Sequence, residues 1–226
     1  MSHDMRIIPL LSLIFGVLML SACSTESRTP SESVSSLTAA EIQFCESCHY
    51  VNGTSKGPEF PKIAGQYDVY LVQAVENFKQ GRRDSETMQR IASLHTEGEM
   101  KKLARYFAEQ KPDESPSISV PDPVLWARGK NIFEKDRVYG IACANCHGYD
   151  GMGYAYESPQ MRNVRAIPRL AGQSYVYLAS ALQKYVEGEN LYGFCTMRKA
   201  GRTLAKDDVK ALVEYLSSLA PGAGRG

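Results

Sequence analysis

Two five-residue stretches of the chain combine a pair of thiols with an adjacent imidazole. They read CESCH at residues 45–49 and CANCH at residues 143–147. Side chains of these types at this spacing are suited to zinc binding, to disulfide exchange or to covalent attachment of a haem. The residues concerned are Cys45, Cys48, His49, Cys143, Cys146 and His147.

The rest of the sequence favours haem over the two alternatives. Structural zinc usually takes four Cys or His ligands. The chain has six cysteines, four of them in the motifs, and only four histidines. Neither motif therefore has a second Cys or His pair near it to complete a zinc site. A redox disulfide would be expected in a thioredoxin-like βαβ context, which the helical pattern of this chain does not provide. Two thiols can add to the two vinyl groups of a haem while the next imidazole reaches the iron. We therefore predict two covalently bound haem c groups, with His49 and His147 as axial ligands.

A second axial ligand is expected downstream of each motif. In class I cytochromes c, which the motifs resemble, it is usually a methionine from a loop. Met88 and Met197 lie in such predicted loops, each before the last helix of its half. We predict both as iron ligands, and His/Met ligation raises the potential relative to bis-His. The alternatives are that both methionines fill the core, that His95 replaces Met88, and that Cys195 competes for the second iron.

Pro61 and Pro168 are predicted to support the two axial histidines. A ligating imidazole needs a partner for its other ring nitrogen, commonly a backbone carbonyl, and in class I cytochromes c a proline after CxxCH supplies it. Pro61 follows His49, and Pro168 follows His147, at a distance along the chain that a loop can span. The simpler alternative is that both prolines start helices.

Each motif lies in a sequence unit that occurs twice in the chain. Residues 61–81 (PKIAGQYDVYLVQAVENFKQG) and residues 168–188 (PRLAGQSYVYLASALQKYVEG) match at a constant offset of 107. Their apolar residues recur at helical spacing, and no alternating run is long enough to predict a strand. Because the unit occurs only twice, this is a duplicated domain rather than a solenoid.

Capping signals predict where the other helices begin. Thr38 with Glu41, and Thr96 with Glu99, form the pattern of a capping box. Asp122 followed by proline suits the N-cap and first turn of a helix in the second half. The sequence therefore predicts an all-α fold with three main helices in each half.

The N-terminus predicts export and a lipid anchor. Residues 1–22 carry an early arginine and an apolar run that is too short for a comfortable membrane span, which is typical of a signal peptide. The ending LSAC resembles the lipobox of bacterial lipoproteins and implies lipidation of Cys23, although an ordinary cleaved signal is the alternative. Ser24 favours the outer membrane of a Gram-negative bacterium. Residues 23–37, rich in Ser, Thr, Glu and Pro, are expected to form a disordered tether.

The remaining chain divides into two predicted domains. These are residues 38–112 and residues 122–221, joined by a proline-rich linker at 113–121. The formal net charge is +1, and no block of Lys and Arg occurs. Nucleic acid is therefore not an expected partner.

Taken together, these features resemble the dihaem cytochrome c4 family. The resemblance rests on CESCH, CANCHG, the doubled P-x-[IL]-A-G-Q segment, the two methionines and the closing helices with LARYF and LVEYL, and it spans residues 38–219. It implies two tandem class I cytochrome c domains about a pseudo-twofold axis, close haems and electron transfer to respiratory partners. Tyr50 follows the first motif where Gly148 follows the second, and Cys195 beside Met197 is a further departure from the family pattern.

The function expected on this basis is that of an electron carrier rather than an enzyme. An iron with six ligands leaves no open position for a substrate, so the protein contributes ligation, burial and docking surface. Expected partners are an upstream cytochrome or dehydrogenase and a membrane oxidase or reductase complex, reached in the periplasm. Two alternatives remain: a permanent electron-accepting subunit of a dehydrogenase, as in flavocytochrome c sulfide dehydrogenase, and a dihaem peroxidase.

Overall fold

The computed structural model describes residues 37–55, 57–119, 121–135, 142–158, 163–189 and 195–221. Residues 37–226 form one compact unit. The predicted signal peptide, Cys23 and residues 23–36 of the predicted tether lie outside the described residues. Across the described ranges, no helix has the length and apolar character needed to span a membrane.

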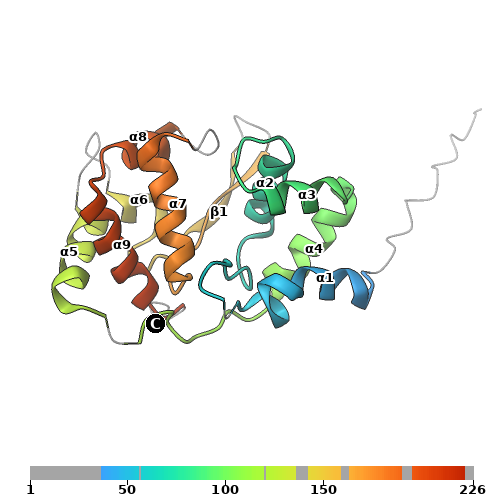
Figure 1. Cartoon of the computed structure of the whole chain (residues 1–226), viewed down its shortest axis with the longest axis horizontal. Coiled ribbons are helices and arrows are strands. Elements are labelled where there is room, and N and C mark those ends of the chain that lie inside the picture. Colours follow the sequence, from blue (N-terminus) through green and yellow to red (C-terminus); the bar gives the residue numbers. More distant parts are fainter. Residues whose placement is uncertain are drawn as a thin grey trace, which may run out of the picture. The chain divides into compact units, whose positions relative to one another are not determined.

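The fold is helical and follows the sequence repeat (Figure 1). Within the described residues, each half contains three longer helices, as predicted, and additional short ones. The first half contains α1 (Ala39–His49), the 3-10 helix η1 (Val51–Gly53), α2 (Asp68–Lys79), α3 (Glu86–Ser93) and α4 (Glu97–Glu109). The second half contains α5 (Pro123–Glu134), α6 (Cys143–His147), α7 (Tyr175–Glu187), α8 (Cys195–Arg202) and α9 (Lys206–Ser218).

The predicted capping signals start three of these helices. Thr38 and Glu41 form a complete capping box at α1, and Thr96 and Glu99 form one at α4. The Asp122 carboxylate accepts hydrogen bonds from the backbone N–H groups of Val124 and Leu125 at the start of α5. The beginnings of these helices are therefore encoded locally, by side chains that satisfy the first backbone donors.

One prediction was wrong, because the second half contains a β-hairpin. Strand β1 (Tyr154–Ser158) pairs with β2 (Asn163–Ile167) in antiparallel fashion, with Tyr154 opposite Ile167. The strands lie in the stretch between the second CxxCH and Pro168, where we expected only a loop. Each strand is five residues long, too short for alternation to give a clear signal, and pairing with the neighbouring strand stabilises it. Strand β2 also packs against α2 of the first half.

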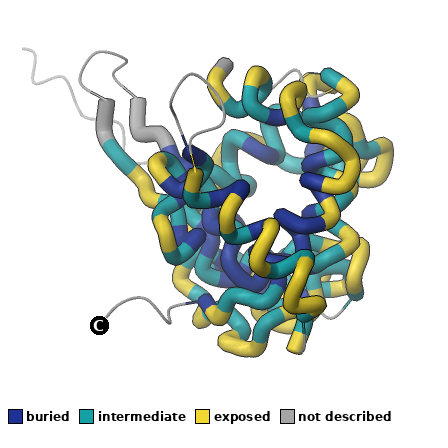
Figure 2. Tube along the Cα trace, turned by 90° about the vertical axis from the view of Figure 1, so that its left-hand side faces the viewer, coloured by how far each residue is buried: buried dark blue, intermediate teal, exposed yellow. Residues whose placement is uncertain are grey.

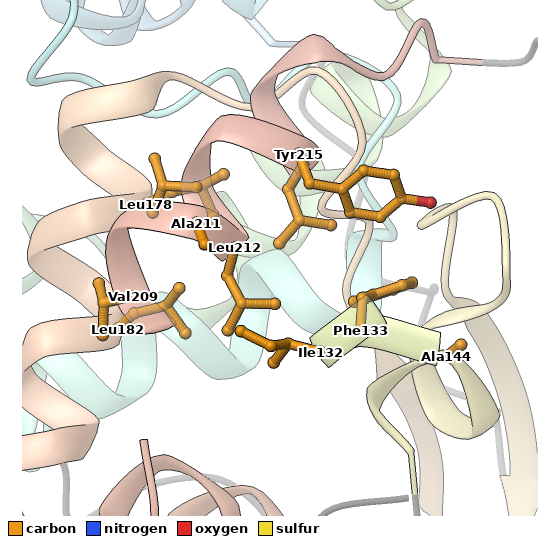
Figure 3. Close-up of a cluster of buried hydrophobic side chains, with 11 residues drawn as sticks. Ile132, Phe133, Ala144, Leu178, Leu182, Val209, Ala211, Leu212 and Tyr215 are labelled. Carbon is orange, nitrogen blue, oxygen red and sulfur yellow. The ribbon is translucent and has the colours of Figure 1, made fainter. Parts of the chain in front are cut away.

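The second half is built around the crossing of α5 and α9. Gly129 lies at the crossing, where a Cβ atom would come within 2.0 Å of the Ala211 carbonyl oxygen. Ile132 and Phe133 of α5 pack with Leu212 and other apolar residues of α9 (Figure 3). Leu178 and Leu182 of α7 and Ala144 of α6 complete this cluster. Exposed residues lie mainly on the outer turns of the helices (Figure 2).

Candidate haem sites

Both CxxCH motifs end a helix. The first occupies the last residues of α1, and the second makes up the whole of α6. The four motif cysteines are half-buried. The pKa of the Cys45 thiol is raised to about 11. Burial has the largest effect, and the nearby Glu46 carboxylate and Cys48 thiol add to it. Among the described residues, no three His, Cys, Asp or Glu side chains gather in a way that could hold a metal ion.

Each motif histidine is held by a proline carbonyl. Nδ1 of His49 lies 3.0 Å from the carbonyl oxygen of Pro61, and Nδ1 of His147 lies 3.0 Å from that of Pro168. Because a carbonyl oxygen can only accept, Nδ1 carries the proton and Nε2 keeps its lone pair. Burial lowers the pKa of both imidazoles, and the bond to proline offsets this in part. A neutral imidazole with a fixed ring and a basic Nε2 is the form that ligates iron.

The loop after each motif repeats its hydrogen bonds. The carbonyl of His49 accepts from the N–H of Ser55 at 2.9 Å, and that of His147 accepts from the N–H of Gly153 at 2.6 Å. Further on, the carbonyl of Gly53 accepts from the N–H groups of Ile63 and Ala64. In the second half, the carbonyl of Gly151 accepts from the N–H groups of Leu170 and Ala171. Both loops therefore bring their proline back to the histidine in the same way.

The two methionines lie in short helices rather than in the loops that we predicted. Met88 is the third residue of α3, and Met197 is the third residue of α8. For α3 the local reason is Ser85, whose side chain accepts from the N–H of Met88 and caps the helix. Both methionines are half-buried. Met197 packs against the apolar cluster that Cys143 also borders.

The other two residues considered for the iron are placed differently. The Nε2 atom of His95 is buried and has no hydrogen-bond partner among the described residues, while its ring lies 6.0 Å from that of Phe44. An unpaired imidazole nitrogen fits a ligand role, so His95 stays an alternative to Met88. Cys195 is the first residue of α8, but its side chain lies outside the described part of the structure.

Two cations are buried in the interior, and one of them, Lys62, is paired with the Asp113 carboxylate at 3.8 Å. Lys62 and Arg169, each directly after its proline, are only 7% and 4% exposed. Burial lowers the pKa of both, that of Arg169 to about 10. Nη1 of Arg169 is buried and finds no hydrogen-bond partner in the described residues. A buried guanidinium is costly without an anion, and the carboxylates of a haem would supply one.

Two buried glutamines were missed as functional residues. We used Gln66 and Gln173 only as markers of the repeat, yet they are 4% and 6% exposed and bond across the two halves. Their signal was present in the sequence: a polar residue kept at the same place in both copies of an apolar segment. A buried amide needs partners, but the sequence did not show which ones.

These features define a cytochrome c, a haem protein of electron transport, and the comparisons agree. The cytochrome c family model matches residues 126–220. Cytochrome c4 of Pseudomonas aeruginosa is 30% identical over 184 residues, covering 80% of this chain and 86% of the relative. The chain belongs to the cytochrome c4 family.

Two further matches bear on fold and partners. The crystal structure of reduced recombinant cytochrome c4 from Pseudomonas stutzeri aligns with a TM-score of 0.67 at 28% identity, over 81% of this chain and 99% of that chain. A thiosulfate dehydrogenase electron acceptor from Stutzerimonas stutzeri is 26% identical over 186 residues, covering 77% of this chain and 78% of the relative. The predicted all-α fold of two tandem cytochrome c domains is thereby confirmed.

Proposed function

We propose that this protein carries single electrons on two covalently bound haem c groups, one in each half. Residues 38–112 and 122–221 would each form one haem domain. The observation that supports this most directly is the repeated pair of His–Pro hydrogen bonds, each 3.0 Å long. Two imidazoles with free Nε2 atoms, each next to a pair of half-buried thiols, are suited to hold two haems.

The residues have separate roles in this proposal. Cys45 and Cys48 attach the first haem and Cys143 and Cys146 the second, through thioether bonds. His49 and Met88 would be the axial ligands of the first iron, and His147 and Met197 those of the second. Haem iron supplies a site that alternates between the ferric and ferrous states by one electron. The chain would hold the imidazoles in one orientation and keep water from the apolar interior, and the buried Arg169 guanidinium would offer a cation to a haem carboxylate.

The spectrum of the mature protein tests this proposal. We expect two haems per chain in a pyridine haemochrome assay, both low-spin, with the weak ferric absorption band of methionine ligation. Cys45→Ser with Cys48→Ser, and separately Cys143→Ser with Cys146→Ser, should each leave one haem. A count of one haem in the unmodified chain, or a high-spin ferric spectrum, would contradict the proposal and return His95 and Cys195 to consideration as ligands.

The place of action that we propose is the periplasm, at a membrane surface. The support is the sequence of residues 1–23, with a signal-like apolar run that ends in a lipobox at Cys23. From there the protein would pass electrons between a respiratory donor and a terminal oxidase or reductase. Mass spectrometry of the mature N-terminus tests the anchor, because Cys23→Ser should abolish lipidation and release the protein from membranes.

A second candidate function is that of a dedicated electron acceptor for one dehydrogenase. The likeness to a thiosulfate dehydrogenase electron acceptor favours it. The two functions differ in partner and not in chemistry. If a dehydrogenase subunit copurifies with the native protein in fixed ratio, and thiosulfate reduces the haems only in its presence, the dedicated role holds. Reduction by several unrelated donors at similar rates would support the general carrier.

A further inference from the structure

The glutamines of the two AGQ segments reach across to the opposite half. Oε1 of Gln173 accepts from the backbone N–H of Lys62 at 2.6 Å, and its Nε2 donates to the Lys62 carbonyl at 2.8 Å. Oε1 of Gln66 accepts from the N–H of Arg169 at 3.0 Å, and its Nε2 donates to the Arg169 carbonyl at 3.1 Å. The pairing is reciprocal, as a twofold relation between the halves requires.

Each glutamine acts on the peptide group that holds the opposite histidine. The N–H of Lys62 and the carbonyl of Pro61 belong to one peptide unit. That unit therefore donates to Gln173 and accepts from Nδ1 of His49 at the same time. In the second half, the peptide between Pro168 and Arg169 donates to Gln66 and accepts from His147.

We propose that Gln66 and Gln173 are positioning residues through which each half sets the strength of the axial histidine in the other. The inference rests on the proposed function, in which His49 and His147 ligate iron. A peptide whose N–H is donated becomes a stronger acceptor at its carbonyl, because hydrogen bonds in a chain polarise one another. A stronger acceptor at Nδ1 makes the imidazole a more basic ligand. More basic ligation stabilises the ferric state and so lowers the potential of that haem.

The hydrogen bonds of the two glutamines are buried, so water cannot take the place of either side chain. Both glutamines are almost wholly buried, and so are the backbone groups that they meet. Water therefore cannot replace the lost acceptor in a leucine variant, and the N–H of Lys62 or Arg169 would be left unpaired. The link crosses between the halves, so a change in one half is expected to alter the haem of the other.

The experiment uses the full holoprotein with Gln173→Leu and Gln66→Leu. Redox titration followed by NMR of the haem methyl groups separates the two midpoint potentials. We expect Q173L to raise the potential of the first haem and leave the second unchanged, and Q66L to do the reverse. In the diamagnetic ferrous protein, the Nδ1–H resonance of His49 should move upfield and exchange faster in Q173L, and that of His147 in Q66L.

Two further variants separate this role from a structural one. Gln173→Glu keeps an acceptor oxygen for the Lys62 N–H, so the His49 Nδ1–H resonance should stay in place or move downfield. This variant also provides the test if Q173L does not fold. Tyr177→Phe removes a different contact between the halves, the hydrogen bond from Arg83 to the Tyr177 hydroxyl, and should change neither Nδ1–H resonance.

The outcomes distinguish the inference from the function on which it rests. Equal shifts of both potentials in Q173L, an unchanged His49 resonance, or the same upfield shift in Q173E would overturn the inference while leaving the electron carrier intact. If the unmodified protein lacks two low-spin haems with His ligation, the proposed function itself is contradicted, and the inference about the glutamines falls with it.

Discussion

Replacing Gly129 with alanine is expected to force α5 away from α9 and to destabilise the protein. A Cβ atom at this position would lie 2.0 Å from the carbonyl oxygen of Ala211 and 2.8 Å from Cβ of Tyr215. Neither atom belongs to the flexible end of a side chain, so the helices themselves must separate. Ile132 and Val213 beside the crossing are fully buried and would lose contacts.

The magnitude follows from two opposing effects. Overpacking a close-packed core costs about 1–3 kcal/mol, and a contact as short as 2.0 Å places this site at the upper end. Alanine in place of glycine in a helix gains about 0.5–1 kcal/mol. The net loss is about 2 kcal/mol, or roughly 4–8 °C in Tm for a chain of this size.

The assay is thermal and urea unfolding of the holoprotein, followed by far-ultraviolet circular dichroism. Gly98→Ala is the matched control, because Gly98 lies in α4 and a Cβ there would meet nothing within 4 Å. It should keep or raise Tm, with a gain of up to about 1 kcal/mol from helix propensity. If G129A proved as stable as G98A, the α5–α9 crossing would not be as close as described.

Substitutions at four other positions have expected outcomes. Met88→Ala and Met197→Ala should each remove the ferric methionine band from one haem only; loss from both in either variant would contradict separate ligation. Asp122→Ala removes the cap of α5 and should cost about 1 kcal/mol in urea unfolding, whereas Asp122→Asn should keep most of the stability. Burial, together with Glu134, raises the pKa of Tyr215 to about 12. The phenol of an unfolded tyrosine has a pKa of about 10. The raised pKa in the folded state therefore adds stability below that pH, and this stability is lost as the pH rises toward 12. Tyr215→Phe should flatten that alkaline loss, and an unchanged slope would contradict the assignment.

The local parts of the fold could be predicted because they depend on neighbours in sequence. The capping boxes at Thr38 and Thr96 and the cap at Asp122 all form as the sequence indicated. The repeat at an offset of 107 also predicted matching helices, and α2 and α7 follow matching AGQ segments. Helix starts of this kind are set by one side chain and the first backbone donors.

The parts that could not be predicted depend on residues far apart in sequence. The bond between Gln173 and Lys62 joins positions 111 residues apart, and no local pattern reports such a pairing. The helical positions of Met88 and Met197 were also missed, since α3 and α8 are each only eight residues long. Short elements take much of their stability from packing rather than from propensity.

The hairpin shows how the second half tolerates its longer loop. In the first half, the Ser55 hydroxyl donates to the carbonyl of Phe60 at 2.9 Å and closes a short connection. In the second half, the corresponding stretch runs from Gly153 to Ile167, and the pairing of Tyr154 with Ile167 closes it. An antiparallel pair returns the chain to the place where it left, because its ends lie side by side. The two paired strands therefore bring the chain back to Pro168, and the His–Pro bond has the same 3.0 Å length in both halves.

The insertion also adds a contact that the repeat alone would not provide. The carbonyl of Gly153, at the base of the hairpin, accepts a hydrogen bond from the Tyr67 hydroxyl of the first half at 3.1 Å. Tyr67 directly follows Gln66, so the hairpin and the glutamine bond to Arg169 hold the same junction. In the other copy Ser174 follows Gln173, and its hydroxyl donates to the carbonyl of Phe60 at 2.9 Å. Each half thus contributes a hydroxyl next to its glutamine, and each hydroxyl bonds to the loop between the opposite histidine and its proline. The two loops that hold His49 and His147 are therefore fixed by the opposite half, and a long connection in one of them need not loosen its His–Pro bond.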